Sequence, residues 1–299
     1  MSGGAEPPLR APASARRTSI RPTHPAPPQY AGPVFTPEGP TLRELAVQAL
    51  SSVERGYDLL APKFDHTPFR TPDRILDATA ETLRGLGSPD GTAAAPFEAG
   101  LDVCCGTGAG IGVLRALCRR TVVGVDFSAG MLALAGERSS GERSSGERSG
   151  GERSGGEAAG APVPEYVRAD ARSLPFVGAF DLAVTFGALG HFLPSERAAV
   201  FRGVHRALRP GGIFAFPIAA PPHPRSALYW TLAGFDAVMR VRNALWRPPF
   251  VMYYRTCALR DVRADLLAAG FAVELVPVRG AARRADGSPG WGLVAARKR

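Results

Sequence analysis

Short apolar runs alternate with helical patterns from Gly100 to the end of the chain, and this alternation limits the fold more than any other feature. Strands that alternate with helices at this spacing form a mostly parallel sheet with helices on both faces. The last two runs have no helical pattern between them, so we expect them to pair as an antiparallel hairpin at one edge. The predicted strands are 100–105, 121–127, 164–170, 180–187, 211–219, 271–280 and 291–298.

The helices are predicted from the spacing of their apolar residues and from the residues at their ends. Ser128 is expected to cap the start of one helix, and Pro72 stands near the start of another. The predicted helices between strands are 110–120, 128–137, 194–208 and 259–270, and two more precede the first strand, within 41–65 and 71–87.

The charge of the chain does not predict a nucleic-acid partner. The formal net charge is +9, but Lys63 and Lys298 are the only lysines, and the arginines are scattered rather than gathered in a run with aromatic residues. This arginine bias, beside much Ala, Gly and Pro, is typical of a GC-rich genome. We therefore expect solvated surface arginines.

The four cysteines form no C-x-x-C pair and have no disulfide-like spacing, which suits a reducing compartment, and no zinc site is expected. The amino-terminal region lacks the continuous apolar segment of a signal peptide, and no stretch approaches the length of a membrane span. The prediction is a cytoplasmic protein without a metal or a membrane partner.

Two segments have compositions that do not favour folding. Residues 1–40 are dense in Pro, Ala, Gly and Ser, and are predicted to be a disordered tail. Residues 137–158 lie in the repeat GERSSGERSSGERSGGERSGGE and are predicted to be a flexible loop inserted within one domain that spans 41–299. In that domain 41–87 supplies the first helices, and 219–258 is long enough to form a lid over a substrate site.

The loop DVCCGTGAG follows the first predicted strand and opens a helix, where open α/β sheets bind their ligands. Its glycines allow a tight bend and a close approach of the backbone to a ligand. Asp126 ends the next strand, where a carboxylate can accept from both ribose hydroxyls. Dinucleotide enzymes would have their third glycine at Ile111, and no Gly-Lys-Ser/Thr follows, so an adenosine ligand of another kind is expected.

The chain resembles class I S-adenosylmethionine-dependent methyltransferases, in the small-molecule branch similar to ubiquinone and menaquinone biosynthesis enzymes. The resemblance rests on LDVCCGTGAG, VVGVDFSAGMLALA, VRADARSLPF, FDLAVTFGALGHF and RALRPGGIFAF, which occur in the family's order. It implies a Rossmann-like three-layer α/β sandwich whose seven-stranded, mostly parallel sheet has an antiparallel last strand. Cys104 departs from the family, which usually has glycine there, and we expect this small residue to be tolerated.

The resemblance also implies that S-adenosyl-L-methionine is the cofactor, with its methionine end at Asp102 and the glycine loop. Asp126 would bind the ribose, Asp170 would frame the adenine, and the end of the fourth strand would lie near the sulfonium. The cofactor-binding residues that it implies are Asp102, Gly106, Thr107, Gly108, Gly110, Asp126, Phe127, Met131, Asp170, Ala171, Phe186 and Gly187.

Methyl transfer from a sulfonium needs mainly an in-line approach and exclusion of water, with a base where the acceptor must lose a proton. His191, just past the fourth strand, is the candidate base, and a packing or capping role is the alternative. Aromatic residues in the lid predict an apolar or aromatic small-molecule acceptor. The candidate lid residues are Tyr57, Tyr229, Trp230, Tyr253 and Tyr254.

Two other classes of function stay open. A noncatalytic relative could keep the fold to bind a partner, since Cys104 departs from the loop pattern. An RNA methyltransferase is favoured only by net charge, and FGALGHF lacks the Asn/Asp-Pro-Pro-Tyr/Phe-like motif of enzymes that methylate base amines. The sequence predicts neither the acceptor nor the oligomeric state.

Overall fold

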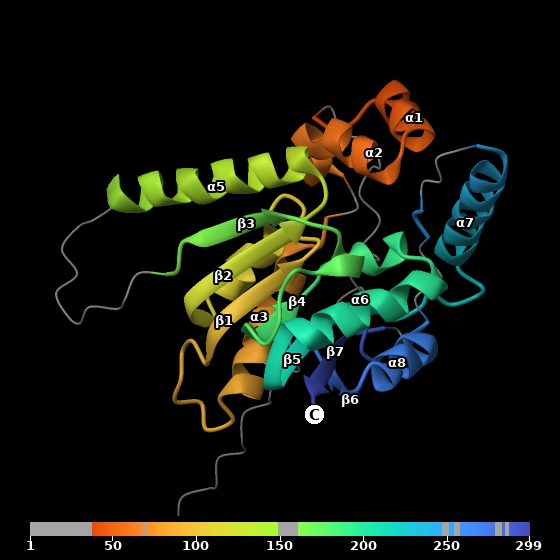
Figure 1. Ribbon diagram of the computed structural model, residues 1–299. Coiled ribbons are helices and arrows are strands. Elements are labelled where there is room, and N and C mark those ends of the chain that lie inside the picture. Colours follow the sequence, from red (N-terminus) through yellow and green to blue (C-terminus); the bar gives the residue numbers. More distant parts are fainter. Residues whose placement is uncertain are drawn as a thin grey trace, which may run out of the picture. The chain divides into compact units, whose positions relative to one another are not determined.

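A seven-stranded sheet organises the computed structural model, in the order β3-β2-β1-β4-β5-β7-β6 (Figure 1). The structure describes residues 38–67, 70–148, 161–246, 251–253, 258–278, 283–284 and 287–299. The strands are β1 (Phe97–Val103), β2 (Cys118–Asp126), β3 (Pro164–Arg168), β4 (Phe180–Val184), β5 (Leu208–Ala219), β6 (Phe271–Pro277) and β7 (Trp291–Lys298). All of them lie in one compact unit, Gly32–Arg299.

The strand directions confirm the predicted sheet. β3, β2, β1, β4 and β5 pair in parallel, whereas β7 is antiparallel both to β5 and to β6. The last two strands thus form the expected hairpin, and β6 is the edge strand. Of the seven strands, β7 runs opposite to the others, between β5 and the edge strand β6 and far from β3 at the other edge.

Helices cover both faces because successive side chains of a strand point to opposite sides. Leu182 and Val184 pack with residues of α3 (Asp73–Gly87) and α4 (Ala109–Arg115). Ala183, between them, packs in the cluster that contains α6 (Pro194–Ala207) and α8 (Leu259–Ala268). Each fully buried Leu, Val or Phe in these layers contributes about 1.5–3 kcal/mol.

The amino-terminal helices are more divided than the sequence predicts. The expected helix within 41–65 is α1 (Leu42–Leu50), α2 (Val53–Leu60) and the 3₁₀ helix η1 (Ala61–His66). The break occurs because the Ser52 side chain caps α2 by accepting from the Arg55 N–H, and the Ser51 hydroxyl donates to the Val47 carbonyl. α3 begins after Pro72, as predicted.

The helix predicted for 110–120 is too long. α4 ends at Arg115, and Cys118, Arg119 and Arg120 belong to β2. The backbone of Cys118 is in register with Phe97 of β1, and the Phe97 N–H donates to the Leu117 carbonyl. Pairing with a neighbouring strand therefore overrides the local helical pattern.

The repeat is also structured in part, which corrects the predicted loop. α5 runs from Ala129 to Arg148, so the helix continues well past Glu137, while 149–160 lie outside the described residues. Ser139 is buried and shares a 2.6 Å hydrogen bond with the Tyr166 hydroxyl, and Arg138 pairs with Asp65. Glu and Arg are good helix formers, so a helix anchored by Met131 can extend into the repeat.

The fifth strand starts earlier than the predicted 211–219. β5 begins at Leu208, and its pairing with β4 skips from Leu208 to Ile213, where Gly211 has φ of 78°. The expected lid contains α7 (Ala227–Leu245), while 247–250 and 254–257 lie outside the description. The predicted tail falls almost wholly on undescribed residues, and the division into tail, insertion and lid stays a prediction.

Candidate active site

The glycine loop between β1 and α4 is a succession of left-handed residues. Cys104, Gly106 and Gly108 have φ of 58°, 52° and 92°. The Cys105 N–H donates to the Val125 carbonyl and the Gly108 N–H to the Cys105 carbonyl, so the loop is tied to β2 and to itself. The backbone curls tightly at the carboxyl end of β1, as the sequence predicts.

Cys104 is the single non-glycine residue with positive φ in the part of the chain that the structure describes. A Cβ in this region meets the following carbonyl oxygen, which costs about 1–2 kcal/mol. The position where the family usually has glycine therefore keeps a glycine's conformation. Cys104 and Cys105 are no reactive thiolates, because burial raises both thiol pKa values well above their usual range.

Asp102 is the most unusual polar residue of the site. It is 1% exposed, and within the described residues neither carboxylate oxygen has a hydrogen-bond donor. Burial first, and the nearby Asp126 second, raise its pKa well above the usual range. A buried acceptor left without a donor costs about 1–3 kcal/mol, so a ligand that supplies a donor would recover that energy.

The absence of a side chain at Gly110 allows this arrangement. A Cβ built at Gly110 would lie 2.4 Å from Asp102 Oδ2 and 2.7 Å from Phe186 Cδ2. Gly110, Asp102 and Phe186 are thus in close contact, as expected for the loop and the end of the fourth strand. Gly187 follows with φ of 76° and turns the chain into the 3₁₀ helix η3 (Ala188–His191).

Asp126 ends β2 beside the loop, as its position in the sequence predicts. The Gly106 N–H donates to Oδ2 and the Ser128 N–H to Oδ1, each at 2.9 Å. Burial raises its pKa although these backbone donors oppose the shift. Each oxygen has a second lone pair, so the carboxylate can still accept from a diol.

The remaining predicted cofactor residues surround this edge. Thr107 is buried and donates to Asp65, Met131 is 1% exposed in α5, and Phe127 is partly buried. Asp170 begins the 3₁₀ helix η2 (Ala171–Ser173), and the guanidinium of Arg172 holds its pKa below the usual range. Ala171 is buried next to it.

Two histidine hydrogen bonds define the surroundings of His191. Its Nδ1 lies 2.9 Å from the Val251 carbonyl, and its Nε2 lies 2.8 Å from the Tyr57 hydroxyl. A carbonyl only accepts, so Nδ1 carries the proton and Nε2 accepts from Tyr57. Burial lowers the His191 pKa and raises that of Tyr57, and both groups are therefore neutral near pH 7.

The charge of Asp126 adds to burial in raising the Tyr57 pKa. The Tyr57 side chain packs against a small apolar cluster of Met239, Val251, Met252 and Tyr253. Tyr57 thus connects His191 to this apolar cluster.

The other candidate lid residues are divided between core and surface. Tyr253 is buried, and its hydroxyl accepts from the Asn243 amide. Its backbone N–H donates to the Gly190 carbonyl. Trp230 is 67% exposed and Tyr229 stacks edge-on against it, so Trp230 does not enclose a site. Tyr254 lies outside the described residues.

Sequence reasoning missed the polar contacts that hold the amino-terminal helices over this edge. Asp58 accepts from the Ser128 hydroxyl at 2.6 Å and from the Gly130 N–H at 2.9 Å. Asp65 accepts from Thr107 at 2.9 Å, and Glu54 pairs with Arg168 at 2.6 Å. No local motif marks these acids, since each is paired with a residue distant in sequence.

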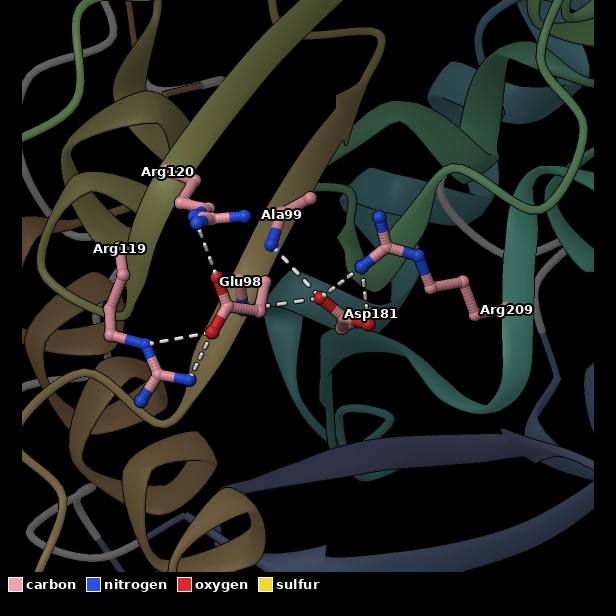
Figure 2. Close-up of polar contacts among 6 residues, drawn as sticks. All are labelled: Glu98, Ala99, Arg119, Arg120, Asp181 and Arg209. Carbon is pink, nitrogen blue, oxygen red and sulfur yellow. Dashed lines mark hydrogen bonds and ion pairs between the residues drawn. The ribbon is translucent and has the colours of Figure 1, made fainter.

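A cavity of about 680 Å³ lies at the opposite end of the sheet, where the parallel strands begin. We call this end the amino edge, and the end that carries the glycine loop the carboxyl edge. It is lined by Glu98, Ala99, Arg119, Arg120, Thr121 and Arg209. Its charges are paired: Arg119 and Arg120 contact Glu98, and Arg209 contacts both oxygens of Asp181 at 2.9 Å (Figure 2). Asp181 also accepts from the N–H groups of Glu98 and Ala99. These charged groups at the starts of the strands already pair with one another, so we do not place the active site there.

Metal and membrane signals are absent from the part of the chain described. No group of three or more His, Cys, Asp or Glu side chains there could hold a metal ion. Among the helices of the described residues, none is long and apolar enough to cross a membrane.

Comparison with known proteins agrees with this geometry. Residues 101–216 match the family model "Methyltransferase domain". An uncharacterized methyltransferase of Synechocystis sp. is 33% identical over 154 residues, which are 51% of this chain and 61% of that protein. The chain therefore spans less than two thirds of this curated relative's length.

A solved structure from Nostoc punctiforme shows the same fold. A Nostoc punctiforme protein proposed to be an O-methyltransferase superposes with a TM-score of 0.55 at 17% identity, over 84% of this chain and 62% of that one. The magnesium protoporphyrin IX methyltransferase of Synechocystis, crystallised with bound SAH, has a TM-score of 0.47 at 16% identity, over 76% and 83%.

The matched segment holds the glycine loop, Asp126, Asp170 and the end of β4, the features from which the sequence predicted a methyltransferase. The small-molecule branch stays a prediction. Residues 101–216 are thus similar to the methyltransferase domain family, in agreement with the resemblance seen in the sequence.

Proposed function

We propose that this chain is an enzyme that transfers a methyl group from S-adenosyl-L-methionine to a small apolar or aromatic acceptor. The observation that carries the proposal is Asp102, whose buried oxygens have no donor in the described structure. A cofactor with an ammonium group would supply that donor beside a loop whose backbone lies open for close approach. The residues present therefore fit the cofactor.

The residues that would hold the cofactor are those at the carboxyl edge. Asp102 and the loop from Gly106 to Gly110 would hold its methionine end, Asp126 its ribose, and Asp170 with Ala171 its adenine. When bound, the cofactor supplies a methyl group on a positively charged sulfur, which is an excellent leaving group. The protein then contributes mainly position and exclusion of water.

Tyr57 and His191 support a relay for an acceptor that must lose a proton. The Tyr57 O–H donates to His191 Nε2, and the hydroxyl oxygen keeps lone pairs that can accept from an acceptor's O–H. Because its pKa is raised, Tyr57 stays protonated and passes a proton on rather than acting as a phenolate. His191, neutral and oriented by Val251, would be the final base.

The apolar cluster around Tyr57 supports the class of acceptor. Met239, Val251 and Met252 lie in the lid and pack against Tyr57, so a group that reaches its hydroxyl would contact apolar side chains. Apolar walls with few polar groups are typical of sites for small organic molecules.

Calorimetry tests cofactor binding first. We expect micromolar affinity for S-adenosyl-L-methionine in the native chain and severe weakening in Asp126→Ala. No binding by the native chain would exclude the proposed enzyme. Binding without transfer of labelled methyl to any compound in a broad metabolite screen would favour the noncatalytic alternative, for which the strained Cys104 is the motivating feature.

The relay is tested by His191→Ala and Tyr57→Phe, compared by turnover with the identified acceptor. Each should lower kcat about 100-fold while the cofactor affinity stays within a factor of about two. The double variant should be no slower than either single one, because the two groups act as a unit. Unchanged turnover in His191→Ala would leave His191 with its packing role.

A further inference from the structure

Helix α7 carries an apolar stripe that faces solvent along its whole length. Trp230, Val238, Val241 and Leu245 are 67%, 66%, 59% and 81% exposed, and Gly234 is exposed between them. These positions recur at steps of three and four residues, so they share one face of the helix. Trp246, directly after the helix, is 51% exposed.

The opposite face of α7 is the one that packs on the protein. Met239 is buried with Val251, Met252 and Tyr253, and Phe235 packs against the same cluster. Asp236 is also buried. The exposed stripe is therefore not the core side of the helix, and α7 presents apolar side chains to the core on one face and, among the described residues, to solvent on the other.

The described charged residues of α7 and of the segment just before it are mostly positive. They are Arg225, Arg240 and Arg242, against one acidic residue, the buried Asp236. Arg240 is exposed and lies over the Tyr253 ring, while Arg242 contacts the Ser51 carbonyl at the junction of α1 and α2. In those two helices Glu44 pairs with Lys63 and Glu54 with Arg168, while Asp58 accepts from Ser128 and Gly130.

An apolar stripe with tryptophans near both ends and arginines at its sides is the pattern of a helix that lies in the interface of a membrane. Such a helix does not span the bilayer, so neither its length nor the lack of a spanning segment opposes this placement. A second copy of this chain is a poorer partner, because symmetric pairing through α7 would bring together two helices that each hold two arginines and one acidic residue.

We propose that α7 docks on the surface of an anionic lipid bilayer, with Trp230, Val241 and Leu245 in the interface and the arginines at the lipid phosphates. This revises the expectation of no membrane partner, which rested on the lack of a spanning segment. The inference depends on α7 alone and is separate from the methyl-transfer reaction.

Co-sedimentation of the full chain with lipid vesicles tests the proposal. The chain should sediment with vesicles that contain phosphatidylglycerol and much less with vesicles of phosphatidylcholine alone. Raising the salt concentration should weaken binding, since surface charge attraction is screened. Equal sedimentation with both vesicles, or with neither, would overturn the proposal.

Matched variants identify the surface responsible. The double variant Val241→Asp with Leu245→Asp should bind anionic vesicles about tenfold more weakly or worse. Val177 is an exposed apolar residue outside α7, with 76% of its surface exposed, so Val177→Asp should bind like the native chain. Arg240→Gln should weaken binding, whereas Arg260→Gln, at an exposed arginine of α8, should not. Equal losses in the test and control variants would contradict a site on α7.

Tryptophan fluorescence gives a second measurement that needs no disruptive substitution. Of the three tryptophans, Trp230 and Trp246 lie at the stripe and Trp291 lies in β7. Anionic vesicles should shift the emission to shorter wavelength, and Trp230→Phe with Trp246→Phe should remove the shift while Trp291→Phe keeps it. A dimer in sedimentation velocity that Leu245→Asp abolishes, without vesicle binding, would replace the lipid by a second copy. Salt-sensitive RNA binding without vesicle binding would replace it by nucleic acid.

Discussion

The two edges of the sheet carry similar acidic residues in opposite circumstances. At the amino edge, Asp181 accepts from two backbone N–H groups and from Arg209, and Glu98 contacts two arginines. At the carboxyl edge, Asp102 is buried without a donor among the described residues. The cavity beside Glu98 and Arg209 lies at the first edge, and the unsatisfied carboxylate of Asp102 lies at the second.

The difference shows that a hollow lined by charges is weaker evidence for a site than a buried charge without a partner. Paired carboxylates and arginines already satisfy one another, so the amino edge gains little from a ligand. A buried carboxylate without a donor is costly until something binds it. By the proposed function, the bound cofactor would stabilise the carboxyl edge, whereas the amino edge is stabilised by its own residues.

Asp102→Asn and Asp181→Asn should separate the two edges most strongly. Asp102→Asn should weaken S-adenosyl-L-methionine binding about 100-fold, because it removes the charge that would pair with the ammonium group. It should also raise the melting temperature of the unliganded chain at a pH above the raised Asp102 pKa, since an unpaired buried charge is then removed. Calorimetry and thermal unfolding measure both.

Asp181→Asn is the matched control at the amino edge. It should lower the free energy of unfolding by about 1–2 kcal/mol, because Arg209 loses its partner, and should leave cofactor affinity unchanged. The comparison fails if the two variants change affinity and stability in the same way.

Acid should weaken cofactor binding through Asp102. Its raised pKa means that the folded chain holds a proton above the pH at which the unfolded chain releases it. The unliganded fold therefore loses stability as pH rises from the ordinary aspartate pKa to the raised one. A positively charged ligand expels this proton, so affinity should rise by up to about tenfold per pH unit over that range and then level off. The effect should be absent in Asp102→Asn, and a pH-independent native affinity would contradict it.

Cys104→Gly should stabilise the glycine loop modestly. Glycine removes the cost of a left-handed Cβ, which is about 1–2 kcal/mol. It also raises the conformational entropy of the unfolded chain, which offsets part of this gain, so the free energy of unfolding should increase by about 0.5–1 kcal/mol. Cys104→Ala keeps the Cβ and should give no gain, which distinguishes strain from the thiol. Denaturant unfolding measures both, and an equal gain in the two variants would exclude strain as the cause.

The smallest effect is expected from the arginines of the amino edge. Arg119→Gln should change stability by about 0.5 kcal/mol or less, since Arg119 is half exposed and such ion pairs contribute little. Cofactor affinity should not change. A large loss of affinity would mean that the amino edge takes part in binding after all.

Local sequence patterns were sufficient to predict the strands of the sheet and the glycine loop. Short apolar runs predicted the strands, and the glycine loop with Asp126 predicted the edge at which we place the site. Cys104 was noticed as a departure, but its left-handed backbone follows from the curl of the loop around β2 and has no sequence signal of its own.

Partnerships between distant residues could not be predicted in this way. The sequence predicts helix at Cys118, but in the structure Cys118 pairs with Phe97 of β1. It predicts a loop at the repeat, but Ser139 lies in a helix and shares a hydrogen bond with Tyr166. Tyr57 and His191 are separated by 134 positions, and no sequence motif near either residue predicts their hydrogen bond.

The order of residues alone thus established an α/β sheet, its glycine loop and the cofactor-binding family, because each is encoded by neighbours within a few positions. The pairing of Tyr57 with His191, the missing donor at Asp102 and the solvent-facing stripe of α7 appeared with the packed molecule. Burial and long-range contact exist only once separate segments have come together, and these properties give a carboxylate its pKa and a helix its free face.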